Sequence, residues 1–280
     1  MTLFTPLRTA LLGSAFALPF AAFAQDTPPD RLDLQGHEVT RSENADFEQV
    51  ISVDGVEVLK DGQVLLDGIT EVAGQQVVTG ISGAGGNACN STPFVLSLKD
   101  GKPVIDGPID SCSWFEMTPQ DGALIFHSEA FPGSPAEIWT WSPVSGLTEA
   151  SPEGFTPKSG QGWENFASLD SAHPIDALGF APVYAEVKAG MSAEDWDAYT
   201  GILAQLGSGD LVEGGYRGSA CNKLICDTEW AILWIDQASQ QAFTMWKGGD
   251  DEMPKTWPAD PGSWPEWVQL DAASSAGGAN

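Results

Sequence analysis

Six Asp-Gly pairs punctuate the stretch between His37 and Leu147, and they constrain the fold more than any other feature of the chain. Asp-Gly accepts positive backbone φ angles and is among the strongest short signals for a β-hairpin turn. The pairs occupy positions 54–55, 61–62, 67–68, 100–101, 106–107 and 121–122. The runs between them are rich in β-forming residues, and no window of this half keeps a helical period. We therefore expect residues 37–150 to form an antiparallel all-β domain, either a meander or a small sandwich.

The chain changes character after residues 151–165, whose three Gly and two Pro are typical of a linker. Ser192 can cap a helix, because Glu194 and Asp195 then lie in its first turn, where the helix dipole favours acidic side chains. Apolar residues recur after it at steps of three and four, which predicts a helix over 192–206.

Later segments of this half alternate as strands. We expect them at Leu211–Gly218, Thr228–Asp236, Gln241–Lys247 and Glu266–Leu270. Both faces of 228–236 are apolar, so this strand should be central in its sheet. Residues 166–271 are thus predicted to be an α+β domain with an antiparallel sheet and a flanking helix, followed by a disordered tail over 272–280.

The first 24 residues are typical of a secretory signal peptide. Arg8 provides a weak positive region, an apolar run follows, and Ala22-Phe23-Ala24 has the small-x-small pattern of a cleavage site. We expect cleavage between Ala24 and Gln25, a flexible leader over 25–36, and a soluble exported protein in the periplasm. No later stretch reaches the roughly 18 apolar residues that a membrane span needs.

Four cysteines in an exported chain indicate disulfides, since that compartment is oxidising. Four thiols allow three connectivities. Local pairing of Cys89 with Cys112 and of Cys221 with Cys226 fits a chain whose halves fold separately. A zinc site is the alternative, but neither spacing is C-x-x-C, and the three His at 37, 127 and 173 are scattered.

The charge balance excludes some partners. There are 12 Lys plus Arg against 39 Asp plus Glu, a net charge of −27, which repels nucleic acid and anionic membrane surfaces. A solvated acidic surface or a cationic partner both remain compatible with it. The common motifs for hydrolase, metalloprotease, EF-hand and nucleotide chemistry are missing, so we assign no catalytic residue, cofactor or metal.

The strongest local signal is the segment between Cys221 and Cys226. A disulfide across four residues makes a rigid loop, and rigidity lowers the entropy lost when a loop enters a partner's cleft. Asn222, Lys223, Leu224 and Ile225 are its candidate contact residues. Apolar residues beside a cation at an exposed tip favour a contact site, whereas a structural staple on a turn is the alternative.

The segment from Tyr216 to Lys247 resembles the Ivy family, periplasmic inhibitors of vertebrate lysozyme. The shared order is Ser219-Ala220-Cys221, a four-residue loop, Cys226 and a two-stranded hairpin. In the family the loop typically reads Cys-Lys-Pro-His-Asp-Cys, and its His engages the catalytic carboxylates of lysozyme. Leu224 and Ile225 occupy the positions of that His and Asp, so this chain lacks the family's central inhibitory contact.

The resemblance implies a binding protein rather than an enzyme. Its partner would be a basic muramidase, either a lysozyme or a lytic transglycosylase of the cell itself, attracted by the acidic chain. A module that binds peptidoglycan fragments or other carbohydrate without inhibiting anything is the alternative. It is suggested by the Trp content, since seven of the 11 Trp follow residue 190. An enzyme using unrecognised carboxylates is a third class.

Overall fold

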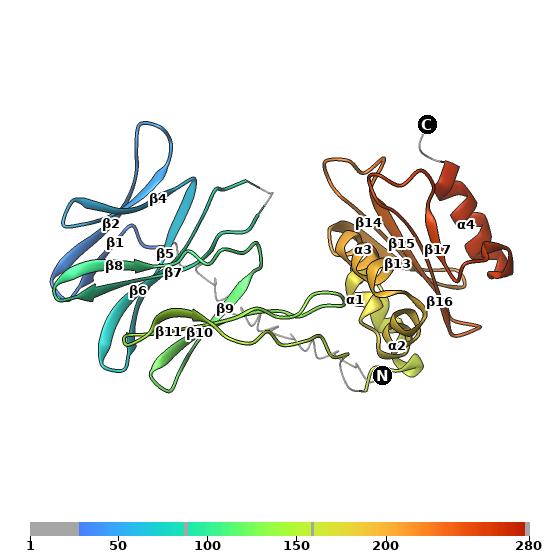
Figure 1. Ribbon diagram of the computed structural model, residues 1–280, viewed down its shortest axis with the longest axis horizontal. Helices are drawn as coiled ribbons and strands as arrows, with labels where there is room; N and C mark the ends of the chain where they lie inside the picture. The colour runs from blue at the N-terminus through green and yellow to red at the C-terminus, as the bar shows by residue number, and fades with distance from the viewer. Residues whose placement is uncertain (1–27, 87–88, 158–159, 278–280) are drawn as a thin grey trace, which may run out of the picture.

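The computed structural model describes residues 28–86, 89–157 and 160–277, which form two lobes (Figure 1). The N-terminal lobe is built from antiparallel sheets. The C-terminal lobe combines helices with one five-stranded antiparallel sheet. The expected fold class, an all-β domain followed by an α+β domain, is confirmed. The expected signal peptide and the cleavage site at Ala24 and Gln25 lie outside the described residues.

The N-terminal lobe consists of three sheets, and each is a meander of four strands. The first sheet contains β1 (Arg31–Leu34), β2 (His37–Glu43), β3 (Gln49–Val53) and β4 (Val56–Asp61). The second contains β5 (Gln63–Val72), β6 (Gln75–Gly83), β7 (Thr92–Lys99) and β8 (Lys102–Asp106). The third contains β9 (Phe115–Gln120), β10 (Ala123–Ser128), β11 (Ile138–Ser142) and β12 (Gly146–Glu149).

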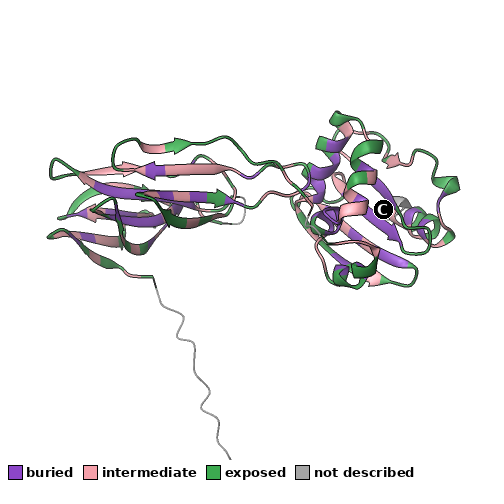
Figure 2. Ribbon diagram, turned by 90° about the horizontal axis from the view of Figure 1, so that it is seen from below, coloured by how far each residue is buried: buried purple, intermediate pink, exposed green. Residues whose placement is uncertain are grey.

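The second sheet lies between the other two and is buried on both faces. Phe94 and Leu96 of β7 pack with the first sheet, while Val95 between them packs with Phe126 and Trp141 of the third. Successive side chains of β7 point to opposite faces of the sheet, so the strand contributes to two hydrophobic cores. The purple segments of Figure 2 mark these buried strands. The lobe is a stack of three sheets, one more than a two-sheet sandwich has.

The Asp-Gly pairs do not all form hairpin turns. Asp54, Asp100 and Asp121 have φ angles of 50°, 52° and 45°, and each closes a two-residue hairpin with the Gly that follows it. Asp67-Gly68 instead lies inside β5, at a register shift that marks a β-bulge. Gly62 lies at the corner between the first and second sheets, where an added Cβ would collide with the carbonyl oxygen of Ala84.

The C-terminal lobe begins with a 3₁₀ helix at Trp163–Leu169. It continues with α1 (Pro174–Leu178), α2 (Ala181–Gly190), α3 (Ala193–Leu203), β13 (Leu206–Val212), β14 (Gly215–Cys221), β15 (Trp230–Asp236), β16 (Gln241–Lys247), β17 (Lys255–Trp257), a 3₁₀ turn (Pro261–Ser263) and α4 (Glu266–Gly277). The sheet order follows the chain order from β13 to β17, so β15 is central, as its two apolar faces predict.

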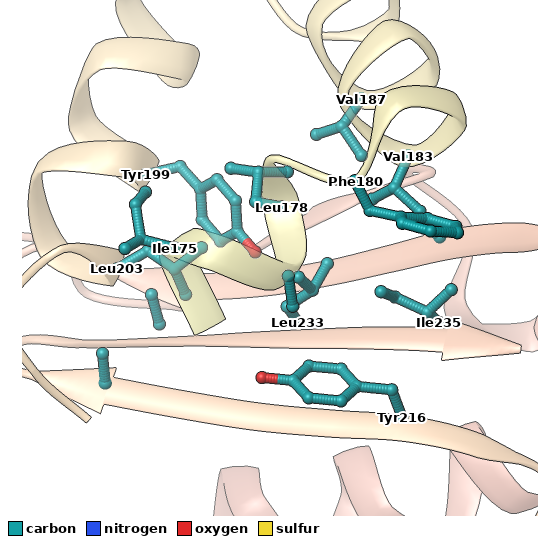
Figure 3. Close-up of a cluster of buried hydrophobic side chains, with 14 of the residues drawn as sticks. Ile175, Leu178, Phe180, Val183, Val187, Tyr199, Leu203, Tyr216, Leu233 and Ile235 are labelled. Atoms are coloured by element: carbon teal, nitrogen blue, oxygen red, sulfur yellow. The ribbon is translucent and has the colours of Figure 1, made fainter. Parts of the chain in front are cut away.

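Helices cover both faces of this sheet. On one face, α1, α2 and α3 enclose a core that includes Tyr199, Leu233 and Ile235 (Figure 3). Burial raises the pKa of the Tyr216 phenol, which donates a hydrogen bond of 2.8 Å to the Ala172 carbonyl. The neutral Tyr216 therefore ties β14 to the segment before α1. On the other face, α4 contributes Val268 to a second apolar cluster.

The predicted helix after Ser192 is confirmed as α3, because the Ser192 side chain accepts a hydrogen bond from the Asp195 amide at 3.1 Å. The expected strand 211–218 is wrong in one respect, since a turn splits it between β13 and β14. The flexible leader is also wrong at 31–34, which pair with β2 and bury Leu34 completely.

The expectations for the last 15 residues differ most from the structure. Residues 266–270 form the start of α4 rather than a strand, and the helix continues to Gly277, through most of the tail expected to be disordered. Val268 and Ala272 are buried at four-residue spacing, which is the helical contact repeat. The segment is helical because it covers the apolar face of β15 and β16.

Two extended segments, 129–137 and 149–157, join the lobes, and we call them the arm (Figure 1). Ala136 and Glu153 form a β-bridge between them. Phe131 packs against the core of the C-terminal lobe, and the Phe155 ring lies 5.1 Å from that of Tyr184. The linker expected at 151–165 therefore contains an anchored aromatic residue.

The domain boundaries stay a prediction. Among the described residues, no helix is long and apolar enough to cross a membrane.

Candidate functional site

The loop between β14 and β15 is the candidate site. Strand β14 ends at Cys221, β15 begins at Trp230, and these two residues are register partners. The Cys221–Cys226 disulfide closes the loop, with 4.9 Å between the two Cα atoms. The pairing expected from the sequence is thus present, and the second expected bridge joins Cys89 to Cys112. Among the described residues there is no free cysteine.

Hydrogen bonds hold the loop from inside. The Asn222 amide nitrogen donates to the Glu229 carbonyl at 3.1 Å, which continues the strand pairing beyond the disulfide. The Asn222 side-chain oxygen accepts from the Leu224 amide at 3.2 Å, and its carbonyl accepts from the Ile225 amide at 2.9 Å. Asn222 is half-buried and shapes the turn, and its contact with a partner stays a prediction.

The tip of the loop presents apolar surface to solvent. Leu224 is 83% exposed and Ile225 is 39% exposed. Lys223 beside them is also exposed. Burial of these apolar side chains against a partner would be favourable, and a disulfide-closed turn reduces the entropy lost when they bind. The arrangement suits insertion into an apolar pocket of another protein.

A neighbouring turn, residues 248–254, belongs to the same surface and was missed from the sequence. A Cβ added to Gly249 would lie 3.7 Å from the Ile225 side chain and 3.5 Å from the Glu229 carboxylate. Met253 in this turn is 74% exposed. No local sequence pattern indicates that the turn at 248–254 lies beside the disulfide-closed loop. They meet because Trp230 and Lys247 are register partners, so the segments before β15 and after β16 leave the sheet at the same edge.

A groove of 680 Å³ runs beside the loop on the face of the sheet that α4 partly covers. Its lining includes Leu206, Trp230 and the two cysteines of the loop. Leu206 is 63% exposed although it pairs with Cys221 in the sheet. The groove, the loop tip and the neighbouring turn are adjacent, and we call them together the loop surface: residues 222–226, 248–254, Leu206 and Trp230.

Acidic groups lie within the loop surface and beside it. Asp227 and Glu229 follow the second cysteine, and residues 250–252 add three more carboxylates. Lys223 is the basic residue of 222–229 and the turn at 248–254 has none, so these two segments are net negative. Such a surface attracts a basic protein. Among the described residues, no cluster of three His, Cys, Asp or Glu is arranged to hold a metal ion.

Mapping of the disulfides tests the pairing directly. We expect no free thiol in denatured, non-reduced protein, because all four cysteines are paired in the structure. Peptide mapping by mass spectrometry should recover Cys89–Cys112 and Cys221–Cys226. A peptide that joins Cys89 or Cys112 to either cysteine of the loop would contradict the two-lobe fold.

Comparison with known proteins matches both lobes. Residues 35–153 match the family described as Y4bG N-terminal domain, and residues 182–278 match the family described as inhibitor of vertebrate lysozyme (Ivy). A protein of Sinorhizobium fredii (strain NBRC 101917 / NGR234), described as uncharacterized protein y4bG, is 32% identical over 228 residues. The alignment covers 80% of this chain and 83% of that protein. No solved structure matches the chain.

Proposed function

Since this chain belongs to the family of the Sinorhizobium fredii protein y4bG, and its residues 182–278 form a domain of the Ivy family, we propose that it is an exported protein that inhibits or modulates a muramidase. The muramidase is a lysozyme or a lytic transglycosylase. The observation that carries the proposal is Leu224, 83% exposed at the tip of the disulfide-closed loop. The proposal assigns binding to the loop surface and no catalytic step to this chain.

Charge supports a basic target. The chain has a net charge of −27, and the acidic groups at 227, 229 and 250–252 lie around the loop tip. Opposite charges raise the association rate and add salt dependence, while the buried apolar contact supplies most of the affinity. We therefore expect binding to weaken as salt rises.

The apolar residues at the loop tip restrict which target clefts it can bind. Leu224 and Ile225 are apolar where the family's loop carries His and Asp, so this loop cannot form a charged hydrogen bond with catalytic carboxylates from those positions. An apolar plug with an acidic surround fits an apolar pocket bordered by basic residues. We propose such a cleft as the target, and we expect weak inhibition of a vertebrate lysozyme.

Replacing Leu224 by Ala is expected to weaken binding to the target muramidase by about tenfold to a hundredfold, because a buried Leu contact at an interface is lost. Binding of a panel of basic muramidases is measured by titration calorimetry and by inhibition of cell-wall lysis. The Leu224→Ala variant should unfold at the same urea concentration as the parent, since the side chain is already exposed.

Val144→Ala is the matched control, because Val144 is 97% exposed in the turn between β11 and β12. It should change neither binding nor unfolding. Strong inhibition that survives both Leu224→Ala and Lys223→Ala would refute the loop as the binding element. Titration with peptidoglycan fragments tests the carbohydrate alternative. The Trp content does not favour that alternative, because Trp196, Trp234 and Trp246 are buried in the core.

A further inference from the structure

A second cleft, of 870 Å³, lies at the root of the arm and takes no part in the loop surface. Its walls come from the segment around the Cys89–Cys112 disulfide, the end of β10 and the start of the arm. It extends to Ala204, which caps the C-terminus of α3. Both lobes thus contribute to it. We call it the Trp114 cleft after its most exposed aromatic residue.

The exposed side chain of Trp114 indicates that the cleft binds a partner. It is 67% exposed, whereas the other Trp side chains among the described residues are buried or half-buried. Its backbone is held on the cleft, since it follows the disulfide residue Cys112 by two positions. The Asn90 side chain donates to the Cys112 carbonyl at 2.9 Å, and the Ser113 amide donates to the Ser111 hydroxyl at 3.0 Å. An exposed indole whose neighbouring backbone is held beside a cavity is typical of a contact residue.

Carboxylates define the charge of the cleft. Glu116, Glu129 and Glu137 line it, and no Lys or Arg is among its described lining residues. Glu137 accepts a hydrogen bond of 2.7 Å from the Ser111 hydroxyl, which fixes that carboxylate at the wall. His127 also lines the cleft, and its Nε2 atom lies 3.9 Å from a carboxylate oxygen of Glu153 in the arm. The cleft therefore combines an open aromatic face with negative charge.

We propose that the Trp114 cleft binds an arginine side chain presented by a basic protein. A guanidinium is planar, so it stacks on an indole face while its N–H groups pair with a neighbouring carboxylate. Both elements are present here in one cavity. A neutral sugar also stacks on an indole, but it leaves the three carboxylates without counter-charge. Charge complementarity therefore favours the arginine.

Most of the Trp114 cleft belongs to the N-terminal lobe, and arginine binding there does not depend on the muramidase proposal. The probe is a blocked peptide with two arginines separated by glycine, titrated against the full exported chain by calorimetry. Its control is the same peptide with neutral citrulline in place of arginine. We expect the arginine peptide to bind, the citrulline peptide to bind at least about tenfold more weakly, and added salt to weaken binding.

Variants locate the binding. Trp114→Ala should weaken the arginine peptide by about threefold to thirtyfold, and the double variant Glu116→Gln, Glu129→Gln should weaken it similarly. Glu57→Gln removes one exposed carboxylate from β4, outside the cleft, where the double variant removes two, and it should have no effect. Circular dichroism and urea unfolding confirm that each variant is folded. Leu224→Ala should leave peptide binding intact, which separates this site from the loop surface.

Three results would overturn the proposal. The first is equal binding of the peptide by the parent and by folded Trp114→Ala. The second is an equal loss in Glu57→Gln, which would assign binding to the overall negative field. The third is binding of a chito-oligosaccharide, lost in Trp114→Ala, with no binding of the arginine peptide, which would make the cleft a sugar site.

Discussion

The double variant Leu224→His, Ile225→Asp is expected to inhibit a vertebrate lysozyme about a hundredfold more strongly than the parent chain does, because a protonated imidazole has two N–H donors, and two charge-assisted hydrogen bonds to the catalytic carboxylates at about 1.5 kcal/mol each amount to that factor. The variant restores the two residues that the family's loop carries at these positions, of which the His engages the catalytic carboxylates. The disulfide and the Asn222 hydrogen bonds already hold positions 224 and 225 in a closed turn. Lysis of a bacterial cell-wall suspension by the lysozyme measures the effect.

The matched control for this gain is Leu224→Ala, Ile225→Ala, which removes the same apolar tip without adding charge. It should leave inhibition of the vertebrate lysozyme as weak as in the parent. Inhibition by the His-Asp variant should also fall at high salt, since the new contacts are charged. No gain in a folded His-Asp variant with its disulfide intact would show that this loop is not presented as the family's loop is.

The second large effect is expected at Asp271, which clamps α4 to the sheet. Its Oδ2 atom accepts hydrogen bonds from Arg217 Nε at 2.7 Å and from Trp234 Nε1 at 2.8 Å. Trp234 is fully buried. Asp271→Ala leaves both donors without a partner, so the free energy of unfolding should fall by about 2–4 kcal/mol. Urea unfolding followed by Trp fluorescence measures it.

Leu270→Ala is the control on the same helix, because Leu270 is 68% exposed. It should change the free energy of unfolding by less than about 0.5 kcal/mol, as surface substitutions usually do. The Asp271→Ala variant should also expose the apolar face beneath α4, which includes Ile232 and Met245, and bind a hydrophobic dye. An Asp271→Ala variant as stable as the parent would show that α4 is held by its apolar contacts alone.

Local interactions account for the parts of the fold that the sequence predicted. The hairpin turns at Asp54, Asp100 and Asp121 depend on two residues that accept positive φ. The start of α3 depends on Ser192 and the amide three residues later. The disulfide-closed loop was predictable for the same reason, since its closure involves cysteines only five positions apart. In each case the deciding atoms are neighbours in the chain.

The tertiary structure decided the rest, because there the deciding atoms are distant in sequence. Asp67-Gly68 has the same two residues as the hairpin turns. It forms a β-bulge inside β5 instead, because β5 pairs with β6 on both sides of it. Residues 266–277 carry weak local preference, and the apolar face of β15 and β16 makes them a helix. The turn at 248–254 joins the loop surface through the pairing of Trp230 with Lys247. Likewise Trp114 and Glu129 line one cavity only because the sheets of the N-terminal lobe and the arm bring strand ends together, and no run of residues encodes that cavity.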